Sequence, residues 1–264
     1  MGIVAVDKSR SVFVKRTLLA AILCLAPLSA HACGNGASCA LGERSYQAKA
    51  PAEWDGTSAL PVMLHFHGWG RTGTNVIRNK RIYEATDANG VLLLAPDGLG
   101  KSWSFWNDNP RDIDFAEAVL ADAATRWPID PKRIYISGFS YGSAMAWAMA
   151  CDSGDKYAGF LGIAGTLSSI ERRDCRTGPF SLRQVHGQKD NVMRPPWGSN
   201  GGAWNKALSL AKCRASTSAQ AGRYERRTWG ACGEGRSVQL DRHTGGHWIP
   251  KGWIEAQLRD LLSR

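Results

Sequence analysis

The chain has 264 residues, of which 44% are hydrophobic and 21% are charged, and its formal net charge at pH 7 is +10. This length suits one large α/β domain or two small ones, and the ordinary apolar fraction excludes intrinsic disorder as the main state. No Gly-x-y period or heptad runs through the sequence, which excludes collagen, coiled coils and solenoids.

The N-terminal segment has the features of an export signal. A basic pair at 15–16 precedes an apolar stretch at 18–28, and Ala30-His31-Ala32 follows as a small-x-small cleavage site. That stretch is shorter than the roughly 20 apolar residues that cross a bilayer, and no later segment is long and apolar enough to do so. We therefore expect residues 1–32 to be a signal peptide and residues 33–264 to be secreted, to the periplasm or the medium. A lipoprotein is the alternative, since a cysteine follows the cleavage site, although alanine stands where a lipobox usually has leucine.

The cysteine content agrees with export. Cys24 lies in the signal, and six cysteines remain, an even number as expected in an oxidising compartment. Six cysteines allow 15 different pairings. Pairing neighbours along the chain gives Cys33–Cys39, Cys151–Cys175 and Cys213–Cys232. Six reduced thiols are the alternative, and a zinc site is less favoured because no Cys-x-x-Cys occurs.

Short apolar runs alternate with helical patterns along the rest of the chain. The runs predict buried parallel strands at 62–66, 91–95, 133–137 and 160–163, with weaker candidates at 180–185 and 237–240. Helices are predicted over 115–127, 143–150 and 253–262. The segment 191–236 is rich in Gly, Arg and Ser, and we expect it to be irregular. This alternation predicts the α/β class, with a doubly wound, mostly parallel sheet and helices on both faces of a single domain.

A G-x-S-x-G pattern spans Gly138-Phe139-Ser140-Tyr141-Gly142. It lies between a predicted strand and a predicted helix, which is the strand–turn–helix setting of a nucleophile elbow. The two glycines leave room for a strained turn that exposes the hydroxyl group of Ser140. Ser140 is therefore the candidate nucleophile, and a glycine-rich turn with a capping serine is the alternative.

A serine becomes nucleophilic when a base takes its proton, and the expected chain order in this fold is serine, acid, histidine. His247 is the candidate base because it lies in a glycine-rich loop after the last predicted strand, and His243 is the alternative. Asp190 is the candidate acid because it follows the preceding strand. Asp241 and Asp174 are the alternatives to Asp190.

Two backbone amides are candidates for an oxyanion hole. One belongs to Tyr141, immediately after the nucleophile, and the other to Trp69 in the loop Phe66-His67-Gly68-Trp69-Gly70. His65 and His67 alternate on a strand and could ligate a metal. No further Asp, Glu or His cluster completes such a site, so we expect neither a metal nor a cofactor.

The sequence has 11 tryptophans, several of them near predicted loop ends. Trp103, Trp106 and Trp248 are candidate substrate-binding residues, since indole rings stack on phenolic groups and sugars. Packing in the core is the alternative. The basic residues are scattered, so we expect no nucleic-acid binding, although a basic surface attracts anionic polymers and cell surfaces. No feature indicates an oligomeric state.

Three segments of the chain carry a family resemblance. They are Ile134 to Met145, which reads Ile-Tyr-Ile-Ser-Gly-Phe-Ser-Tyr-Gly-Ser-Ala-Met, then His186-Gly187 with Asp190, and Gly245-Gly246-His247. These segments resemble secreted esterases of the polyhydroxybutyrate-depolymerase type, which are similar to bacterial feruloyl and acetylxylan esterases. The resemblance implies an α/β-hydrolase fold, ester hydrolysis and the triad Ser140, Asp190 and His247. It also implies that Cys151–Cys175 and Cys213–Cys232 are bridged.

The sequence departs from this family in places that bear on the substrate. Ser143 and Thr244 stand where the family often has glycine, and Trp248 follows His247 without the usual intervening residue. We expect a secreted serine esterase that hydrolyses a polyester oligomer or a plant cell-wall ester through an acyl-enzyme. The alternatives are an acyltransferase on the same scaffold and a non-catalytic secreted binding protein.

Overall fold

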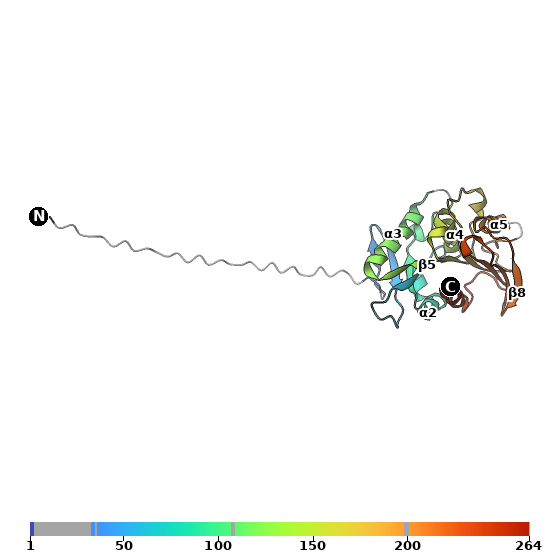
Figure 1. Cartoon of the computed structure of the whole chain (residues 1–264), viewed down its shortest axis with the longest axis horizontal. Coiled ribbons are helices and arrows are strands. Elements are labelled where there is room, and N and C mark those ends of the chain that lie inside the picture. Colours follow the sequence, from blue (N-terminus) through green and yellow to red (C-terminus); the bar gives the residue numbers. More distant parts are fainter. Residues whose placement is uncertain (3–32, 35, 107–108, 198–200, 264) are drawn as a thin grey trace. The chain divides into compact units, whose positions relative to one another are not determined.

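The computed structural model describes residues 1–2, 33–34, 36–106, 109–197 and 201–263 (Figure 1). The chain divides into two units, Met1–Ala30 and His31–Arg264. The predicted signal peptide falls almost entirely on residues 3–32, outside the described residues. Every helix and strand reported below belongs to the second unit.

A ten-stranded sheet runs through the second unit in the order β1-β2-β4-β3-β5-β6-β7-β10-β9-β8 (Figure 1). The strands are β1 (Cys39–Leu41), β2 (Arg44–Lys49), β3 (Leu60–Phe66), β4 (Leu92–Pro96), β5 (Ile129–Phe139), β6 (Gly159–Ile163), β7 (Leu182–Gly187), β8 (Thr217–Ala221), β9 (Tyr224–Trp229) and β10 (Val238–His243). The central strands from β4 to β10 pair in parallel, and the flanking pairs at both ends are antiparallel.

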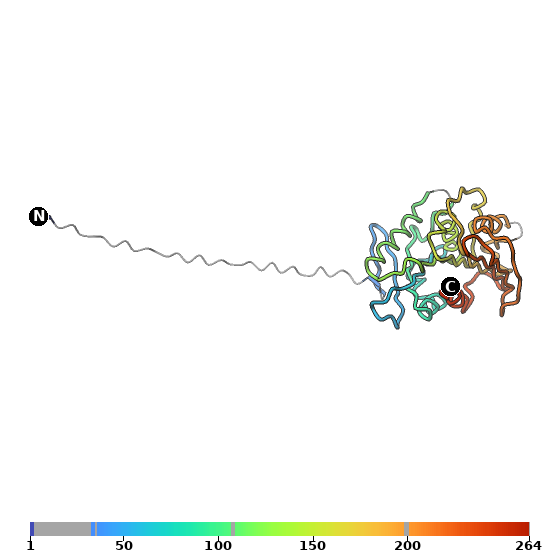
Figure 2. The backbone as a smooth tube through the Cα atoms, in the orientation of Figure 1, coloured from blue at the N-terminus to red at the C-terminus, as the bar shows by residue number. Residues whose placement is uncertain are grey.

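Helices cover both faces of this sheet. They are α1 (Gly73–Arg78), α2 (Lys80–Asp87), α3 (Arg111–Arg126), α4 (Tyr141–Ser153), α5 (Gly201–Leu210) and α6 (Trp253–Leu262). Apolar residues of α3, α4 and α5 pack on one face, and those of α1, α2 and α6 pack on the other. The C-terminal helix α6 lies beside α2, as the tube in Figure 2 shows. Because both faces are covered, β3 and β4 are buried along their whole length, as expected for central parallel strands.

The predicted strands correspond to β3, β4, β5, β6, β7 and β10, and the predicted helices correspond to α3, α4 and α6. The expectation that 191–236 is irregular is wrong, since α5, β8 and β9 lie there. Strands β8 and β9 form an antiparallel hairpin at the sheet edge, where four of the five residues of β8 are exposed and the residues of β9 alternate between partly buried and exposed up to the buried Trp229. An edge hairpin of this kind needs no apolar run, so the hydrophobic pattern does not reveal it.

Three disulfides link cysteines that are neighbours along the chain, Cys33–Cys39, Cys151–Cys175 and Cys213–Cys232. The first joins the start of the second unit to β1, and the second joins α4 to the loop after β6. The third closes the segment from the end of α5 to the turn after β9. Each therefore restrains a connection between regular elements.

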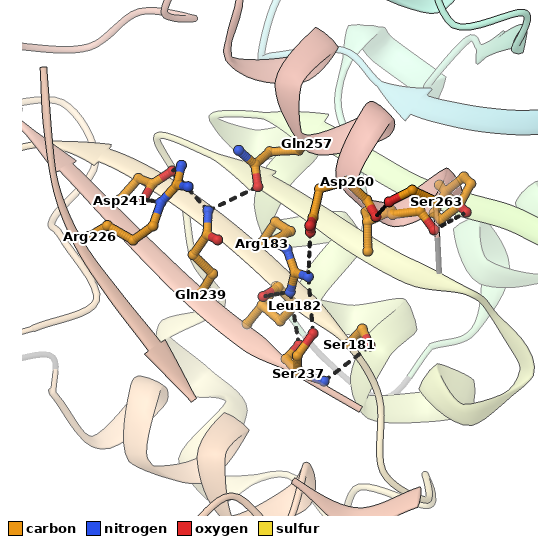
Figure 3. Close-up of polar contacts among 12 residues, drawn as sticks. Ser181, Leu182, Arg183, Arg226, Ser237, Gln239, Asp241, Gln257, Asp260 and Ser263 are labelled. Carbon is orange, nitrogen blue, oxygen red and sulfur yellow. Dashed lines mark hydrogen bonds and ion pairs between the residues drawn. The ribbon is translucent and has the colours of Figure 1, made fainter. Parts of the chain in front are cut away.

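A buried polar cluster ties β9 and β10 to α6 (Figure 3). Both carboxylate oxygens of Asp241 accept hydrogen bonds from the guanidinium of Arg226, at 2.7 and 2.9 Å. Asp241 Oδ2 also accepts from Trp253 Nε1 at 2.8 Å and from Gln239 Nε2 at 3.0 Å. This carboxylate thus supplies the acceptors for three buried or half-buried donors.

Replacing Asp241 by alanine is expected to lower the free energy of unfolding by about 3 kcal/mol, because Arg226 and Trp253 would lose their acceptor. Guanidinium denaturation at pH 7 measures this change. Glu43→Ala, at an exposed site in the turn between β1 and β2, is the control and should change stability by less than about 0.5 kcal/mol. Equal effects of the two substitutions would show that the buried cluster does not stabilise the fold.

Candidate active site

The G-x-S-x-G segment forms a sharp turn from β5 into α4. Ser140 occupies the turn with φ 58° and ψ −118°, a conformation that non-glycine residues rarely adopt. A Cβ added at Gly138 would lie 2.1 Å from Gly142 O, and one added at Gly142 would lie 2.0 Å from Phe66 O. Both glycines are therefore required by the close approach of backbone, and the turn projects the Ser140 side chain from the carboxyl edge of the sheet.

Three loops at this edge bring Ser140, His247 and Asp190 together. His247 Nε2 lies 2.9 Å from Ser140 Oγ, and His247 Nδ1 lies 2.8 Å from Asp190 Oδ2. An ionised carboxylate only accepts hydrogen bonds, so Nδ1 carries the proton and Nε2 is free to accept from the serine hydroxyl. Ser140 follows β5, Asp190 follows β7 and His247 follows β10. The parallel strands thus place all three side chains at one edge, with the geometry of a nucleophile, a base and an orienting acid.

The carboxylate of Asp190 is held in its ionised form. Burial raises the pKa of Asp190. Hydrogen bonds from His247 and from the amides of Met193 and Val192 lower it by more, so the pKa lies below the ordinary value of an aspartate. The amides donate to Oδ1 at 3.0 Å and 2.9 Å, while Oδ2 faces the imidazole. One oxygen is therefore fixed by the backbone and the other orients His247.

His186 is a neighbour of this acid for which the sequence predicted no role in the site. Its Nε2 lies 3.1 Å from Asp190 Oδ2 and 2.9 Å from Met193 O, so this nitrogen carries the proton and donates toward both acceptors. Burial lowers the pKa of His186, which favours the neutral ring. The only available signal was its position four residues before Asp190, at the end of the same strand.

The amides of Tyr141 and Trp69 remain available to a ligand. Among the hydrogen bonds within the described residues, neither amide is used as a donor. The loop that carries Trp69 approaches the nucleophile closely, since a Cβ added at Gly68 would lie 3.7 Å from Ser140 Cβ. Both amides therefore lie in segments that adjoin the nucleophile, as an oxyanion hole requires.

Trp103 does not line a cleft, contrary to expectation. Its side chain is only 2% exposed, and its Nε1 donates to His67 O at 2.8 Å. The ring packs against Phe66 and His67, with centroids 4.9 and 4.5 Å apart. His67 itself donates from Nδ1 to Gly68 O and accepts at Nε2 from Gly98 N. Trp103 and His67 thus hold the loop of Trp69 in place.

The other candidate aromatic residues lie at the surface. Trp69 and Trp106 are 69% and 61% exposed, and both contact the ring of Tyr141, with centroid distances of 6.4 and 5.5 Å. Trp248 is also exposed, and it stacks on His243 with ring centroids 5.3 Å apart. Trp69, Trp106 and Tyr141 therefore form an aromatic surface next to the nucleophile.

The alternative triad residues have other surroundings. The ring of His243 is near Trp248, and its Nδ1 accepts from Gly245 N at 3.1 Å. Asp241 is in β10 and is bound to Arg226. Asp174 is exposed in the loop beside Cys175. Within the described residues, no group of three or more His, Cys, Asp or Glu is arranged to hold a metal ion.

His65 is fully buried in β3 below the candidate active site. Its Nδ1 lies 3.0 Å from Ser137 Oγ, and burial lowers its pKa to about 3. In the unfolded chain the same side chain titrates near pH 6.5. The unfolded chain therefore binds a proton that the folded chain does not bind, and the stability of the fold decreases as the pH falls from 6.5 toward 3.

Lowering the pH from 7 to 5 is expected to cost about 2 kcal/mol of unfolding free energy through His65 alone. Guanidinium denaturation at the two pH values measures the difference. The glutamine of His65→Gln keeps an N–H donor but does not titrate. Between pH 7 and pH 5 this variant should therefore lose about 2 kcal/mol less unfolding free energy than the wild type loses. Identical losses in the two proteins would contradict this account.

Sequence comparisons show which known proteins the chain resembles. A sequence model of the Phospholipase/Carboxylesterase family matches residues 114–210. The NocK protein of Nocardia uniformis subsp. tsuyamanensis is 32% identical over 51% of this chain and 41% of its own length. Feruloyl esterase D of Neurospora crassa is 24% identical over 87% of this chain and 85% of its own length. The matched region thus spans less than half of NocK but most of the feruloyl esterase.

The fold is similar to that of an acetyl xylan esterase from Aspergillus awamori, with a TM-score of 0.62. The match covers 83% of this chain and 94% of that enzyme at 12% identity, which shows a shared fold alone. Together, the comparisons confirm the predicted α/β-hydrolase fold, the predicted resemblance to feruloyl esterases and the prediction of an enzyme of the serine-esterase type. In the described part of the chain, no helix is long and apolar enough to cross a membrane.

Proposed function

We propose that the chain is a secreted serine esterase that cleaves carboxylic esters through an acyl-enzyme at Ser140. The observation that carries this proposal is the continuous contact from Asp190 through His247 to Ser140, with distances of 2.8 and 2.9 Å. The strained backbone of Ser140 at the strand–helix turn supports it. The similarity to feruloyl esterases supports an ester as the substrate.

In the first half of the reaction, His247 Nε2 takes the proton of Ser140 while Oγ attacks the ester carbonyl carbon. The amides of Tyr141 and Trp69 hold the negative charge that develops on the carbonyl oxygen. The tetrahedral intermediate then collapses, and the alcohol leaves with the proton from His247. Asp190 stays ionised throughout and stabilises the imidazolium.

In the second half, water attacks the acyl-enzyme by the same route. His247 takes a proton from the water, and the same two amides hold the oxyanion again. Ser140 recovers its proton as the acid is released. An acceptor alcohol in place of water would give acyl transfer, since the triad and the oxyanion hole serve both reactions.

The aromatic surface bears on the substrate class. The exposed rings of Trp69 and Trp106 lie next to Tyr141, the residue after the nucleophile. Such rings stack on a phenolic acyl group or on a sugar. We therefore propose plant cell-wall esters of the feruloyl type first, with acetylated xylan and hydroxybutyrate oligomers as the other ester classes to test.

Secretion is part of the same proposal. Residues 1–32 have the pattern of a signal peptide, and six cysteines of the remaining chain form three disulfides, which persist in oxidising compartments. N-terminal sequencing of the exported protein should find Cys33 as the first residue. Export with the N-terminal segment still attached would contradict removal of a signal peptide.

The test of function is a panel of esters with product analysis. The purified protein is assayed on methyl ferulate, acetylxylan, a hydroxybutyrate oligomer and p-nitrophenyl butyrate, each with and without an acceptor alcohol. We expect release of the free acid in water, with the highest kcat/KM on the feruloyl ester. A folded protein that hydrolyses none of these esters would overturn the proposal, and products formed only with the acceptor would indicate an acyltransferase.

A further inference from the structure

The turn that carries Asp190 closes over a histidine at the end of β7. The side chain of this residue, His186, is fully buried. Its Nε2 donates to Met193 O at 2.9 Å and lies 3.1 Å from Asp190 Oδ2. A carbonyl and an ionised carboxylate only accept hydrogen bonds, so Nε2 carries the proton of the ring. One N–H group therefore faces both the first and the last residue of the turn 190–193.

The backbone of Met193 links this histidine to the other oxygen of the acid. Met193 N donates to Asp190 Oδ1 at 3.0 Å, while Met193 O accepts from His186. His186 thus holds the segment that fixes Oδ1, and it faces Oδ2 directly. Because Oδ2 also accepts from His247 Nδ1 at 2.8 Å, a tilt of the carboxylate would lengthen the bond that orients the base. The position of His186 therefore bears on both oxygens of Asp190.

A polar ring at this position has a cost that packing does not offset. His186 Nδ1 is buried and, in the part of the chain that the structure describes, has no hydrogen-bond partner. A buried polar atom without a partner lowers stability. Leu182 and Val185 on the same strand show that β7 also buries apolar side chains, which carry no such cost. The hold on the turn of Asp190 accounts for a histidine here.

We propose that His186 is a positioning residue for ester hydrolysis, which keeps the carboxylate of Asp190 aimed at His247 by bracing the turn 190–193. This inference rests on the proposed function, because it assigns the acid of the triad a partner of its own. His186 acts through Asp190 and moves no proton. Loss of its N–H group should therefore lower kcat and leave KM unchanged, since the orientation of the acid matters when the imidazolium forms in the transition state.

His186→Met and His186→Gln are a matched pair, because the two side chains have similar length and only glutamine keeps an N–H donor. On p-nitrophenyl butyrate at pH 7, His186→Met should lower kcat by about tenfold or more and leave KM within about twofold of the wild type. His186→Gln should restore kcat to within about threefold of the wild type.

Circular dichroism and guanidinium denaturation establish that each variant is folded. His186→Leu is a second variant without a donor, so a folding defect of His186→Met does not decide the result. Equal losses of kcat in the glutamine variant and in a folded donor-free variant would overturn the proposal. Wild-type kcat in a folded donor-free variant would overturn it as well.

Combination with Asp190→Asn shows whether His186 acts through the acid. In the Asp190→Asn protein, His186→Met should lower kcat by less than about a further twofold, because the carboxylate that it orients is already lost. A further loss as large as in the wild-type background would reject action through Asp190. A folded wild-type protein that hydrolyses no ester would reject the proposed function, whereas an active wild type with an unimpaired His186→Met variant would reject only this role of His186.

Discussion

Replacing Ser140 by alanine is expected to lower kcat for p-nitrophenyl butyrate by about 10⁵- to 10⁶-fold. His247 would have no hydroxyl to deprotonate, and no acyl-enzyme could form. Only the small acceleration that the oxyanion hole and substrate binding supply would remain. The measurement is kcat from initial rates at saturating substrate, with enough enzyme to detect slow turnover.

The loss must come from chemistry rather than from unfolding. The Ser140→Ala protein should have the circular dichroism spectrum of the wild type and a similar melting temperature. Ser168→Ala, at an exposed serine that begins the short 3-10 helix after β6, is the matched control and should keep full activity. A folded Ser140→Ala protein with more than about one per cent of wild-type kcat would exclude Ser140 as the nucleophile, since replacing the serine of a triad lowers kcat by far more than about a hundredfold.

Replacing Asp190 by asparagine is expected to lower kcat by about 10⁴-fold. The carboxylate accepts the Nδ1 proton of His247 at 2.8 Å and thereby keeps Nε2 free for the serine proton. An amide in its place can present an N–H group, which favours the tautomer with the proton on Nε2 and blocks its role as base. The measurement is again kcat at pH 7 and saturating substrate.

Asp174→Asn is the control for this change, since Asp174 was one of the two alternative acids and lies exposed beside Cys175. We expect its kcat to stay within about twofold of the wild type, as is usual for a surface substitution. If Asp174→Asn lost activity while Asp190→Asn kept it, the assignment of the orienting acid would be wrong.

The nucleophile could be predicted because its signal is local. A Cβ at Gly138 or at Gly142 would lie 2.1 or 2.0 Å from a backbone oxygen, so both positions require glycine, and this requirement leaves a pattern of five consecutive residues. His247 and Asp190 needed one further argument, the order of strands along the chain. Because parallel strands end at the same edge of the sheet, residues 50 to 107 positions apart could be expected to meet there.

Trp103 shows where this reasoning fails. Its position near the end of a predicted loop suggested a cleft, but its Nε1 is committed to His67 O and its ring is buried. Burial of a loop residue depends on which segments fold over it, and neither composition nor spacing records that. The contact of His186 with Asp190 was missed for a similar reason, since it depends on how the loop from 188 to 193 turns back over the strand.

Long-range packing also created the features with no sequence signal. The hairpin of β8 and β9 pairs with β10 through β9, and its own sequence has no continuous apolar run. The contact of His65 Nδ1 with Ser137 Oγ joins β3 to β5, and Ser137 Oγ donates in turn to Leu161 O in β6. Each of these features requires partners that only the folded sheet brings together.

Covalent labelling by a fluorophosphonate tests the central claim most directly, because the probe reacts with a serine only when its hydroxyl is activated. The mature protein is incubated with the probe at pH 7, digested, and the adduct is located by mass spectrometry. The account predicts one adduct per chain, on the peptide that contains Ser140, and much slower labelling of the Asp190→Asn protein. A folded wild-type protein that takes up no label, or takes it up on another residue, would contradict the account and favour a non-catalytic binding protein or a different nucleophile.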